Sequence, residues 1–360
     1  MKGDLNKGDV IGGRYEITDW INEGGMQHVY LAKDTYFDRL VALKSPKEDT
    51  AVKRFQHSAA VGALINHPNV AKTLDYVEVD DKAYLIEEFI AGLDLSQISP
   101  RQLPYIPPGP ASRILHHMAR GLAASHRAGV VHRDLKPSNV MVSGGIHLTD
   151  VKITDFGIAT MAEGEIGPWA AGADKGTRSR TILGAIPYMA PESISDFKNA
   201  EKPSDVWSLA AITYELVSGS RPFGKGTDAL LKILAAAPPS LPEKFKHSQF
   251  KAAGTELYET LLACFAKNPG DRPTADELVQ RCGALCYGDE TYELGVIKLR
   301  RNGYTGFITP QKGRDLMYHR DSFYGDQTHA VGDQLWFARH LGGGNDRAMP
   351  VVKLPSLKGS

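Results

Sequence analysis

The chain contains little cysteine, no net charge and no long apolar run. Only three of its 360 residues are cysteines, and the 42 Lys and Arg balance the 42 Asp and Glu. So few cysteines exclude a disulfide framework and are typical of a reducing cytoplasm. Cys282 and Cys286 share a helical face by spacing, but without nearby ligands they predict buried thiols rather than a metal site. Because the net charge is zero, the overall charge does not indicate any class of partner.

No apolar run approaches the roughly 20 residues that a membrane helix needs. The start of the sequence, MKGD, also lacks the apolar stretch of a signal peptide. These absences predict a cytoplasmic protein without membrane contact. The apolar fraction of 42% and the charged fraction of 23% are those of a globular protein. At this length, two domains are expected.

Two short strings carry the chemistry: HRDLKPSN at 132–139 and DFG at 155–157. Asp134 can orient a hydroxyl and accept its proton, and Lys136 can neutralise charge on a phosphoryl group in transfer. Asn139 and Asp155 offer the oxygen ligands that Mg²⁺ prefers when it bridges phosphates. A charged loop with DFG by chance is the alternative, but both strings in this order and spacing rarely coincide.

These strings resemble the eukaryotic-like (Hanks-type) serine/threonine protein kinases, and the resemblance runs from about residue 15 to 285. VALK at 41–44, MAPE at 189–192, SDVWSL at 204–209 and DRP at 271–273 are similar to further family motifs in the same order. The resemblance implies that Lys44 holds the α- and β-phosphates of ATP and that Arg272 pairs with Glu192. Lys136 is the version of that position found in serine/threonine kinases.

The function implied by the resemblance is Mg²⁺-dependent transfer of phosphate from ATP to serine or threonine hydroxyls of a protein substrate. Asp134, Lys136 and Lys44 would be catalytic, and Asn139 and Asp155 would bind metal. The backbone of the hinge at 88–90 would meet the adenine. The implied nucleotide site comprises Asn22, Gly24, Gly25, Val29, Ala42, Lys44, Glu87, Glu88, Phe89, Ile90 and Met141. The alternative is a pseudokinase scaffold that binds nucleotide, with the main binding activity in the tail.

The phosphate loop departs from the family pattern G-x-G-x-x-G. The segment reads NEGGMQ at 22–27, so only the middle glycine, Gly24, remains. Asn22 tolerates positive φ, which would preserve the first turn. Gln27 is bulkier than glycine, so ATP is expected to bind less tightly. Near the APE segment, Ala185 replaces a threonine and removes one hydrogen bond, worth about 1 kcal/mol.

Lys44 lacks its usual acidic partner in the helix of the small lobe. The expected position falls on Ser58, and no acid lies between Phe55 and Asn66. Glu87 occupies the usual apolar position just ahead of the hinge, close to where Lys44 would point. We hypothesise that Glu87 replaces the missing partner, because an unpaired buried charge costs several kcal/mol. The alternative, that Glu87 turns outward into water, stays open at this point.

Arg133 precedes the catalytic aspartate, as in kinases whose activation loop is ordered by phosphate. The loop carries KGTRSRT at 175–181. Phosphate on Thr177, Ser179 or Thr181 would pair with Arg133. A charged loop with ordinary solvated hydroxyls is the alternative.

The pattern of residues predicts a small lobe at 12–90 and a large lobe at 91–286. Alternating β-branched and aromatic residues predict strands at 15–19, 29–34, 41–45, 73–79 and 82–88, with a helix at 52–65. Five prolines at 100–110 predict an ordered loop. Apolar periodicity then predicts helices at 111–128, 202–218, 227–237, 255–266 and 274–287.

From residue 293 the sequence changes to short alternating strands with glycine turns. GVIKLRRNGYTGFI at 295–308, DLMYH at 315–319 and VGDQLWF at 331–337 resemble cold-shock domains, which are small five-stranded OB barrels that bind single strands. Thr305 is an insertion in the first motif. The tail has ten Lys or Arg against six acids, an excess of four.

The resemblance implies single-stranded RNA or DNA as a partner of this barrel, at 293–355. Candidate contacts are Lys298, Arg300, Tyr304, Phe307, Tyr318 and His319, with Phe323 as a further stacking platform. The alternative is a barrel whose aromatics pack internally or against the kinase, and which docks protein. The predicted fold is therefore α+β: a bilobal kinase fold followed by a small all-β OB-like barrel. The substrate protein, the activating signal and the oligomeric state are not predicted.

Overall fold

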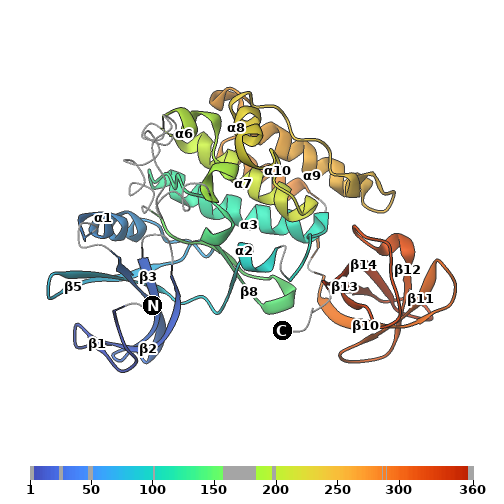
Figure 1. Ribbon diagram of the computed structural model, residues 1–360, viewed down its shortest axis with the longest axis horizontal. Coiled ribbons are helices and arrows are strands. Elements are labelled where there is room, and N and C mark those ends of the chain that lie inside the picture. Colours follow the sequence, from blue (N-terminus) through green and yellow to red (C-terminus); the bar gives the residue numbers. More distant parts are fainter. Residues whose placement is uncertain are drawn as a thin grey trace.

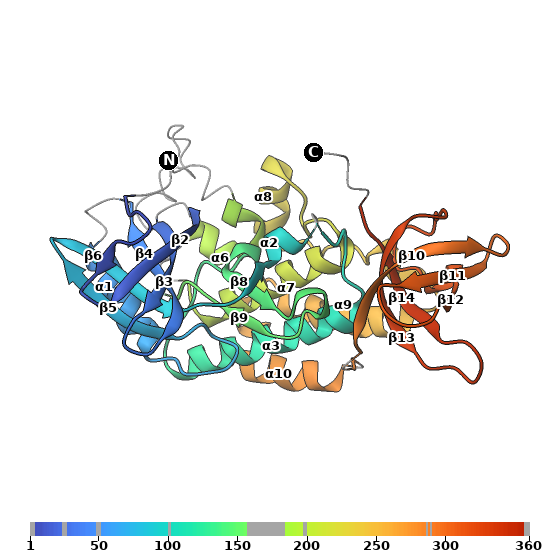
Figure 2. The ribbon, with the colours of Figure 1, turned by 90° about the horizontal axis from the view of Figure 1, so that it is seen from below.

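A computed structural model describes residues 4–23, 27–47, 52–99, 102–156, 184–196, 200–285, 287–288 and 290–355. Figure 1 shows three parts: a sheet-rich small lobe, a helical large lobe and a separate β-barrel. The large lobe lies between the other two, and Figure 2 confirms this order from a second direction. The predicted fold class, a bilobal α+β fold followed by a small barrel, is confirmed.

The small lobe is a six-stranded antiparallel sheet in the order β1-β2-β3-β4-β6-β5, packed against one helix. Five of its strands overlap those predicted from alternation, whereas the two-residue β1 is too short to show a pattern. Its inward residues, including Tyr15, Tyr30 and Leu43, are fully buried. The elements are β1 (Val10–Ile11), β2 (Tyr15–Glu23), β3 (Gln27–Asp34), β4 (Arg39–Pro46), α1 (Val52–Ala63), β5 (Thr73–Val79) and β6 (Lys82–Glu88).

The large lobe is built on α3 and α7, which pack along the middle of the molecule (Figure 1). Among the described residues, no helix is both long enough and apolar enough to cross a membrane. The helices are α2 (Leu95–Ile98), α3 (Pro108–Arg127), α6 (Pro191–Ser195), α7 (Lys202–Ser218), α8 (Gly226–Leu234), α9 (Lys251–Cys264) and α10 (Ala275–Ala284).

Helix α3 begins three residues earlier than predicted, inside the proline-rich segment that was expected to be a loop. Pro108 stands at the first helical position, where a missing N–H costs nothing and φ already has a helical value. Helix α10 ends at Ala284, short of the predicted residue 287. Cys264 and Cys282 are free thiols and are fully buried, as predicted for Cys282, whereas Cys286 lies outside the described residues.

A three-stranded sheet at the lobe junction carries the chemical strings. It consists of β7 (Gly92–Asp94), β8 (Val140–Ser143) and β9 (Val151–Ile153). The HRDLKPSN string leads into β8, and the DFG string follows β9. Because β8 and β9 are antiparallel neighbours with Val140 opposite Ile153, the two strings meet at one end of this hairpin.

The C-terminal part is a closed barrel in the order β10-β11-β12-β14-β13. Its strands are β10 (Tyr292–Arg300), β11 (Thr305–Pro310), β12 (Leu316–His319), β13 (Gln334–His340) and β14 (Arg347–Lys353). The interior is filled by Ile297, Ile308, Leu316, Tyr318, Phe323, Leu335, Phe337, Ala348 and Val351.

The barrel is docked firmly on the large lobe, at the end away from the small lobe (Figure 1). The buried Tyr324 hydroxyl donates to the carbonyl of Val217 at the end of α7, at 2.8 Å. Trp336 donates from Nε1 to the carbonyl of Ile146 at 2.8 Å. Tyr324 and Trp336 belong to the same apolar cluster as the core of the large lobe. The barrel therefore shares a continuous core with the large lobe.

We expect Tyr324→Phe to lower the stability of the barrel and of the large lobe together. It leaves the Val217 carbonyl buried without a partner, which costs about 1–3 kcal/mol. Hydrogen–deuterium exchange should show peptides from α7 and from β13 losing protection in parallel. Tyr36→Phe is the control, because Tyr36 is 73% exposed. A loss of protection confined to peptides from β13, with α7 unchanged, would contradict a shared core.

Candidate functional site

Asp134, Lys136 and Asn139 form a compact polar cluster in the loop before β8. Lys136 Nζ lies 2.7 Å from Asp134 Oδ2. Asn139 donates from Nδ2 to the Asp134 carbonyl at 2.8 Å and approaches its Oδ2 at 3.3 Å. The Asp134 carboxylate therefore has a fixed position, half-buried at the mouth of the site, where it can accept a proton from a bound hydroxyl.

The backbone of this loop is strained and is held by a buried carboxylate. Arg133 has φ of 65°, in the left-handed region that non-glycine residues rarely adopt. Asp205, which is 1% exposed in the first turn of α7, accepts the backbone N–H groups of His132 and Arg133, both at 2.8 Å. His126 Nε2 also contacts it, at 2.9 Å. The sequence analysis gave Asp205 no role of its own, although it lies in the SDVWSL string that resembles a family motif.

Asn139 and Asp155 lie at the same end of the β8–β9 hairpin, joined by a bond from the Thr154 N–H to the Asn139 carbonyl at 2.9 Å. Because Asn139 donates through Nδ2, its Oδ1 is an acceptor, and in this structure it accepts a long bond of 3.4 Å from the Ser138 hydroxyl. The described residues contain no group of three or more His, Cys, Asp or Glu that could hold a metal. Mg²⁺ commonly uses one or two protein oxygens plus phosphates and water, and these two side chains fit that pattern.

Lys44 lies between two carboxylates in a buried cluster. Its Nζ is 2.5 Å from Glu87 Oε2 and 2.7 Å from Asp155 Oδ1. The contact hypothesised from the sequence between Glu87 and Lys44 is therefore present, and Glu87 does not turn into water, being 6% exposed. The sheet explains the pairing: Ala42 lies opposite Glu87, so Lys44, two residues further along β4, projects from the same face.

This cluster contains one amino group and two carboxyl groups, and burial and the neighbouring charges shift the pKa of all three. Burial alone would lower the pKa of Lys44, but Asp155 and Glu87 raise it above its usual value. Burial would raise the pKa of Asp155, but Lys44 and the Gln27 amide hold it below its usual value. Burial raises the pKa of Glu87. One cation thus faces two carboxylates, and a divalent ion bound at Asp155 would balance the excess negative charge.

Gln27 contributes a contact that sequence reasoning missed. Its Nε2 donates to Asp155 Oδ1 at 3.0 Å, whereas its Oε1 is buried without a hydrogen-bond partner among the residues that the structure describes. At the position of the third family glycine, this side chain lies against the carboxylate proposed to bind metal. Asn22 does not have positive φ; it continues β2 and pairs with Val29. Ser58 is 1% exposed, and its Oγ has no hydrogen-bond partner in the described part of the chain.

The other nucleotide-site candidates lie around the lobe junction. Val29 is opposite Lys44, and Met141 is opposite Asp94; Val29, Ala42 and Met141 are half-buried. The candidate hinge connects β6 to β7, and its Glu88 carboxylate pairs with Lys152 at 3.0 Å. It includes Phe89 and Ile90, both half-buried, whereas Gly24 and Gly25 lie outside the described residues.

The proposed phosphate acceptors Thr177, Ser179 and Thr181 also lie outside the described residues. Arg133 is described: its Nε donates to the Ala200 carbonyl at 3.0 Å, and no acid pairs with its guanidinium in the described part of the chain. The Arg133 guanidinium, beside the start of α7, can therefore bind a further anionic acceptor.

On the barrel, four of the six candidate contacts have exposed or half-buried side chains. Arg300, Tyr304 and His319 are exposed, and Phe307 is half-buried. His319 lies 3.4 Å from Asp321, whereas Arg300 forms no ion pair with another described residue. Lys298 is exposed and pairs with Asp315 at 2.7 Å.

Two aromatic expectations for the barrel surface are wrong. Tyr318 and Phe323 are each 1% exposed and pack inside the barrel, so their rings are not stacking platforms. In β12, Leu316 and Tyr318 face inward, while Met317 and His319 face outward.

The predicted pair of Arg272 and Glu192 is present and makes stability depend on pH. Arg272 donates to both carboxylate oxygens, at 2.5 and 2.9 Å. Burial alone would raise the pKa of Glu192, but these bonds hold it below its usual value. The pair therefore stabilises the fold above the unfolded-state pKa of about 4.3, and this stabilisation is lost as the pH falls through the lower folded-state pKa.

We expect Glu192→Gln to lower the free energy of unfolding by about 1.5–3 kcal/mol at pH 7, because a charged acceptor is lost. Urea unfolding at a series of pH values should show the gap from wild type narrowing below about pH 4.3. Glu78→Gln, at an exposed position in β5, is the control. A gap that does not change with pH would contradict an ionised Glu192.

Comparisons with known proteins agree with this geometry. A family profile described as the protein kinase domain matches residues 15–282. The chain is 33% identical over 280 residues to the serine/threonine-protein kinase pkn3 of Myxococcus xanthus, covering 75% of this chain and 49% of that protein. It is 34% identical over 270 residues to the serine/threonine-protein kinase PrkC of Bacillus subtilis, covering 70% and 40%. The chain thus spans half or less of the length of these relatives.

Among solved structures, the fold is similar to the crystal structure of Rad53 1–466 in complex with AMP-PNP. The TM-score is 0.58 at 22% identity, covering 74% of this chain and 64% of that one. Because the profile match takes in both lobes and the site between them, the chain belongs to the protein kinase domain family.

Proposed function

We propose that this chain is a serine/threonine protein kinase that transfers phosphate from ATP to protein hydroxyls with Mg²⁺. The observation that carries the proposal is the convergence of Asp134, Asn139 and Asp155 beside a buried Lys44 at one lobe junction. The similarity to serine/threonine-protein kinases supports the acceptor class. The AMP-PNP bound to the structurally similar Rad53 supports ATP as the donor.

Each side chain has a defined task. Asp134 accepts the proton of the acceptor hydroxyl, and Lys136, 2.7 Å from it, lies where it can neutralise charge on the phosphoryl group. Lys44 holds the α- and β-phosphates. Asn139 and Asp155 would hold Mg²⁺, which neutralises charge on the phosphate oxygens. Glu87 positions Lys44 from within the sheet.

We also propose that phosphate on the activation loop regulates the enzyme and that the protein is cytoplasmic. Phosphate on Thr177, Ser179 or Thr181 would pair with Arg133, whose guanidinium has no acidic partner among the described residues. The free thiols of Cys264 and Cys282 suit a cytoplasmic protein.

A second candidate function is binding of single-stranded RNA or DNA by the cold-shock-like barrel. Within the described residues, six barrel cations form no ion pair, whereas Lys298, Arg339 and Lys353 are paired. Two of the unpaired arginines lie over aromatic rings: Arg320 over the exposed Tyr304 at 4.9 Å, and Arg301 over the half-buried Phe307 at 5.6 Å. Free cations beside aromatic rings suit phosphates and bases. The six are Arg300, Arg301, Lys312, Arg314, Arg320 and Arg347.

Asp134→Asn should abolish phosphate transfer while leaving ATP binding intact, because the amide keeps the size of the side chain but cannot accept the hydroxyl proton. Labelled ATP and a serine-rich acceptor protein should show a rate at least about 100-fold below wild type. Phosphopeptide mapping of the wild-type sample shows whether Thr177, Ser179 or Thr181 in the activation loop carries phosphate. Equal transfer by both proteins, or none by wild type, would contradict the kinase proposal and favour a scaffold.

Glu87→Met should reduce ATP turnover by weakening the position of Lys44. Loss of one partner of a buried pair typically costs about 3–5 kcal/mol, and Asp155 compensates in part because it also contacts Lys44. ATP turnover and ATP affinity are both measured. Glu87→Gln is the control, because its amide keeps an oxygen that can accept a hydrogen bond from Lys44. Full retention of turnover in Glu87→Met would show that Glu87 does not position Lys44.

A further inference from the structure

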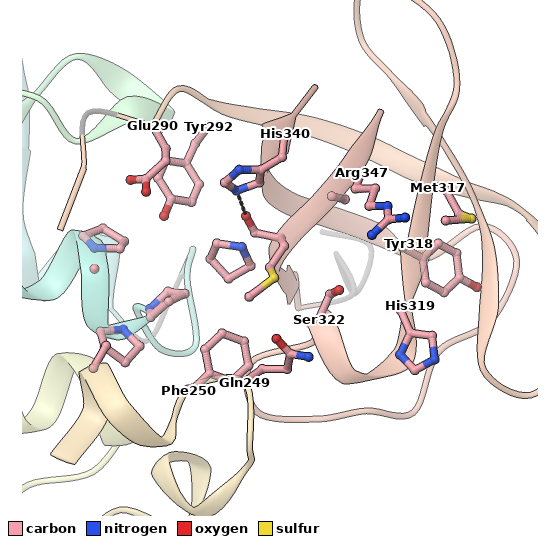
Figure 3. A pocket seen from close by; sticks show the side chains of 18 of the residues that line it. Gln249, Phe250, Glu290, Tyr292, Met317, Tyr318, His319, Ser322, His340 and Arg347 are labelled. Atoms are coloured by element: carbon pink, nitrogen blue, oxygen red, sulfur yellow. Dashed lines mark hydrogen bonds between the residues drawn. The ribbon is translucent and has the colours of Figure 1, made fainter. Parts of the chain in front are cut away.

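A cavity of about 630 Å³ lies between the barrel and the large lobe. Figure 3 shows its two walls, with the large lobe on one side and the barrel on the other. The large lobe contributes Pro107 and Pro108 at the start of α3, with Phe250 and Ala253 at the start of α9. This volume lies within the range of about 300–1,000 Å³ that is usual for ligand pockets.

The barrel wall of this cavity continues the outer face of the sheet. Leu299 lies opposite Phe307, Phe307 opposite Met317, and Met317 opposite Arg347. These four side chains form one outward row across four strands, which we call the outer row. Leu299 is 49% exposed on the open face, whereas Met317 and Arg347 line the cavity. The outer row therefore runs from open surface into the cavity without interruption.

A second set of outward side chains lies beside the outer row. Thr305 is opposite His319, and both line the cavity. The Tyr304 ring, 56% exposed, stacks on His319 at 18° with 6.4 Å between ring centroids. Aromatic rings at this rim provide flat surfaces of the kind on which unpaired bases stack.

The charges of the cavity suit an anion attached to a flat apolar group. Arg347 has no ion-pair partner among the described residues, and His319 lies on the same wall (Figure 3). Glu290, the one acid among the lining residues, lies on the other side of the pocket in that view. Phe250 and the two prolines make the opposite wall apolar. A nucleotide combines a phosphate for Arg347 with a base for this apolar wall, whereas an acidic peptide offers charge without a planar ring.

We propose that a single strand of RNA or DNA follows the outer row and enters this cavity, so that the large lobe of the kinase forms part of the strand-binding site. The inference rests on the proposed binding of single-stranded nucleic acid by the barrel, and it adds that the large lobe also contacts the nucleic acid. A strand in this position contacts the starts of α3 and α9 and bridges the two parts of the chain.

The test compares two charge insertions in the full chain, both in the first turn of α9. Ala253→Glu places a carboxylate in the cavity, whereas Ala252→Glu adds the same charge at an exposed position that does not line it. Fluorescence anisotropy with a labelled oligouridine of about 12 nucleotides measures affinity. We expect Ala253→Glu to weaken binding about tenfold more than Ala252→Glu does. Thermal melting confirms that both variants fold.

A second variant addresses the barrel wall. Arg347→Gln should lower the slope of log affinity against log salt by about one, the signature of one lost phosphate contact. Phe307→Ala, which alters the open face, should weaken binding regardless of what occupies the cavity.

The outcomes separate the two proposals. If Phe307→Ala weakens binding while Ala253→Glu matches Ala252→Glu, the strand stays on the open face and the inference is overturned, although strand binding stands. If the wild-type chain binds no oligonucleotide, strand binding itself fails, and the inference with it. If polyglutamate displaces the oligonucleotide at equal charge concentration, the cavity recognises acidic chains in general and the nucleic-acid assignment is wrong.

Discussion

The ion pairs of Lys44 hold the proposed catalytic centre together. One buried ammonium contacts Glu87 from a neighbouring strand and Asp155 from the large lobe, so a single cation joins the two lobes. Burying these charges is expensive, and the cost is offset only because each has a partner at hydrogen-bond distance. The excess carboxylate then makes the cluster receptive to a divalent cation.

The acidic partner of Lys44 lies on a strand and not on a helix, and this determines what holds Lys44 in place. A partner on a helix can be withdrawn when the helix moves, but Glu87 belongs to β6, which is hydrogen-bonded to the strand of Lys44 itself. The position of Lys44 therefore depends on the register of the sheet and not on α1, where Ser58 stands. In the large lobe, Asp205 has a comparable role, since it holds the strained backbone of the loop that carries Asp134. Both halves of the site are thus positioned by buried carboxylates.

Much of this arrangement could be predicted from the sequence. The catalytic strings and both lobes followed from motif order and strand position, because local spacing determines them. The contact of Glu87 with Lys44 was one of two alternatives, and the sequence could not decide between them because a strand pattern does not show which way a carboxylate turns. The contact of Gln27 with Asp155 could not be predicted, since it joins segments 128 residues apart with no charge pattern to signal it. Tyr318 was misassigned because motif similarity was given more weight than strand alternation. The docking of Tyr324 and Trp336 was left among the alternatives, because the sequence pattern of a buried aromatic is the same whether it packs within a barrel or against a neighbouring lobe.

The most direct test of the central claim is a crystal structure of the chain with Mg²⁺ and a non-hydrolysable ATP analogue. We expect the Asn139 and Asp155 oxygens to coordinate Mg²⁺, with Lys44 on the α- and β-phosphates and still in contact with Glu87. A complex in which Asn139 and Asp155 face away from the nucleotide, or in which Lys44 touches no phosphate, would contradict the account.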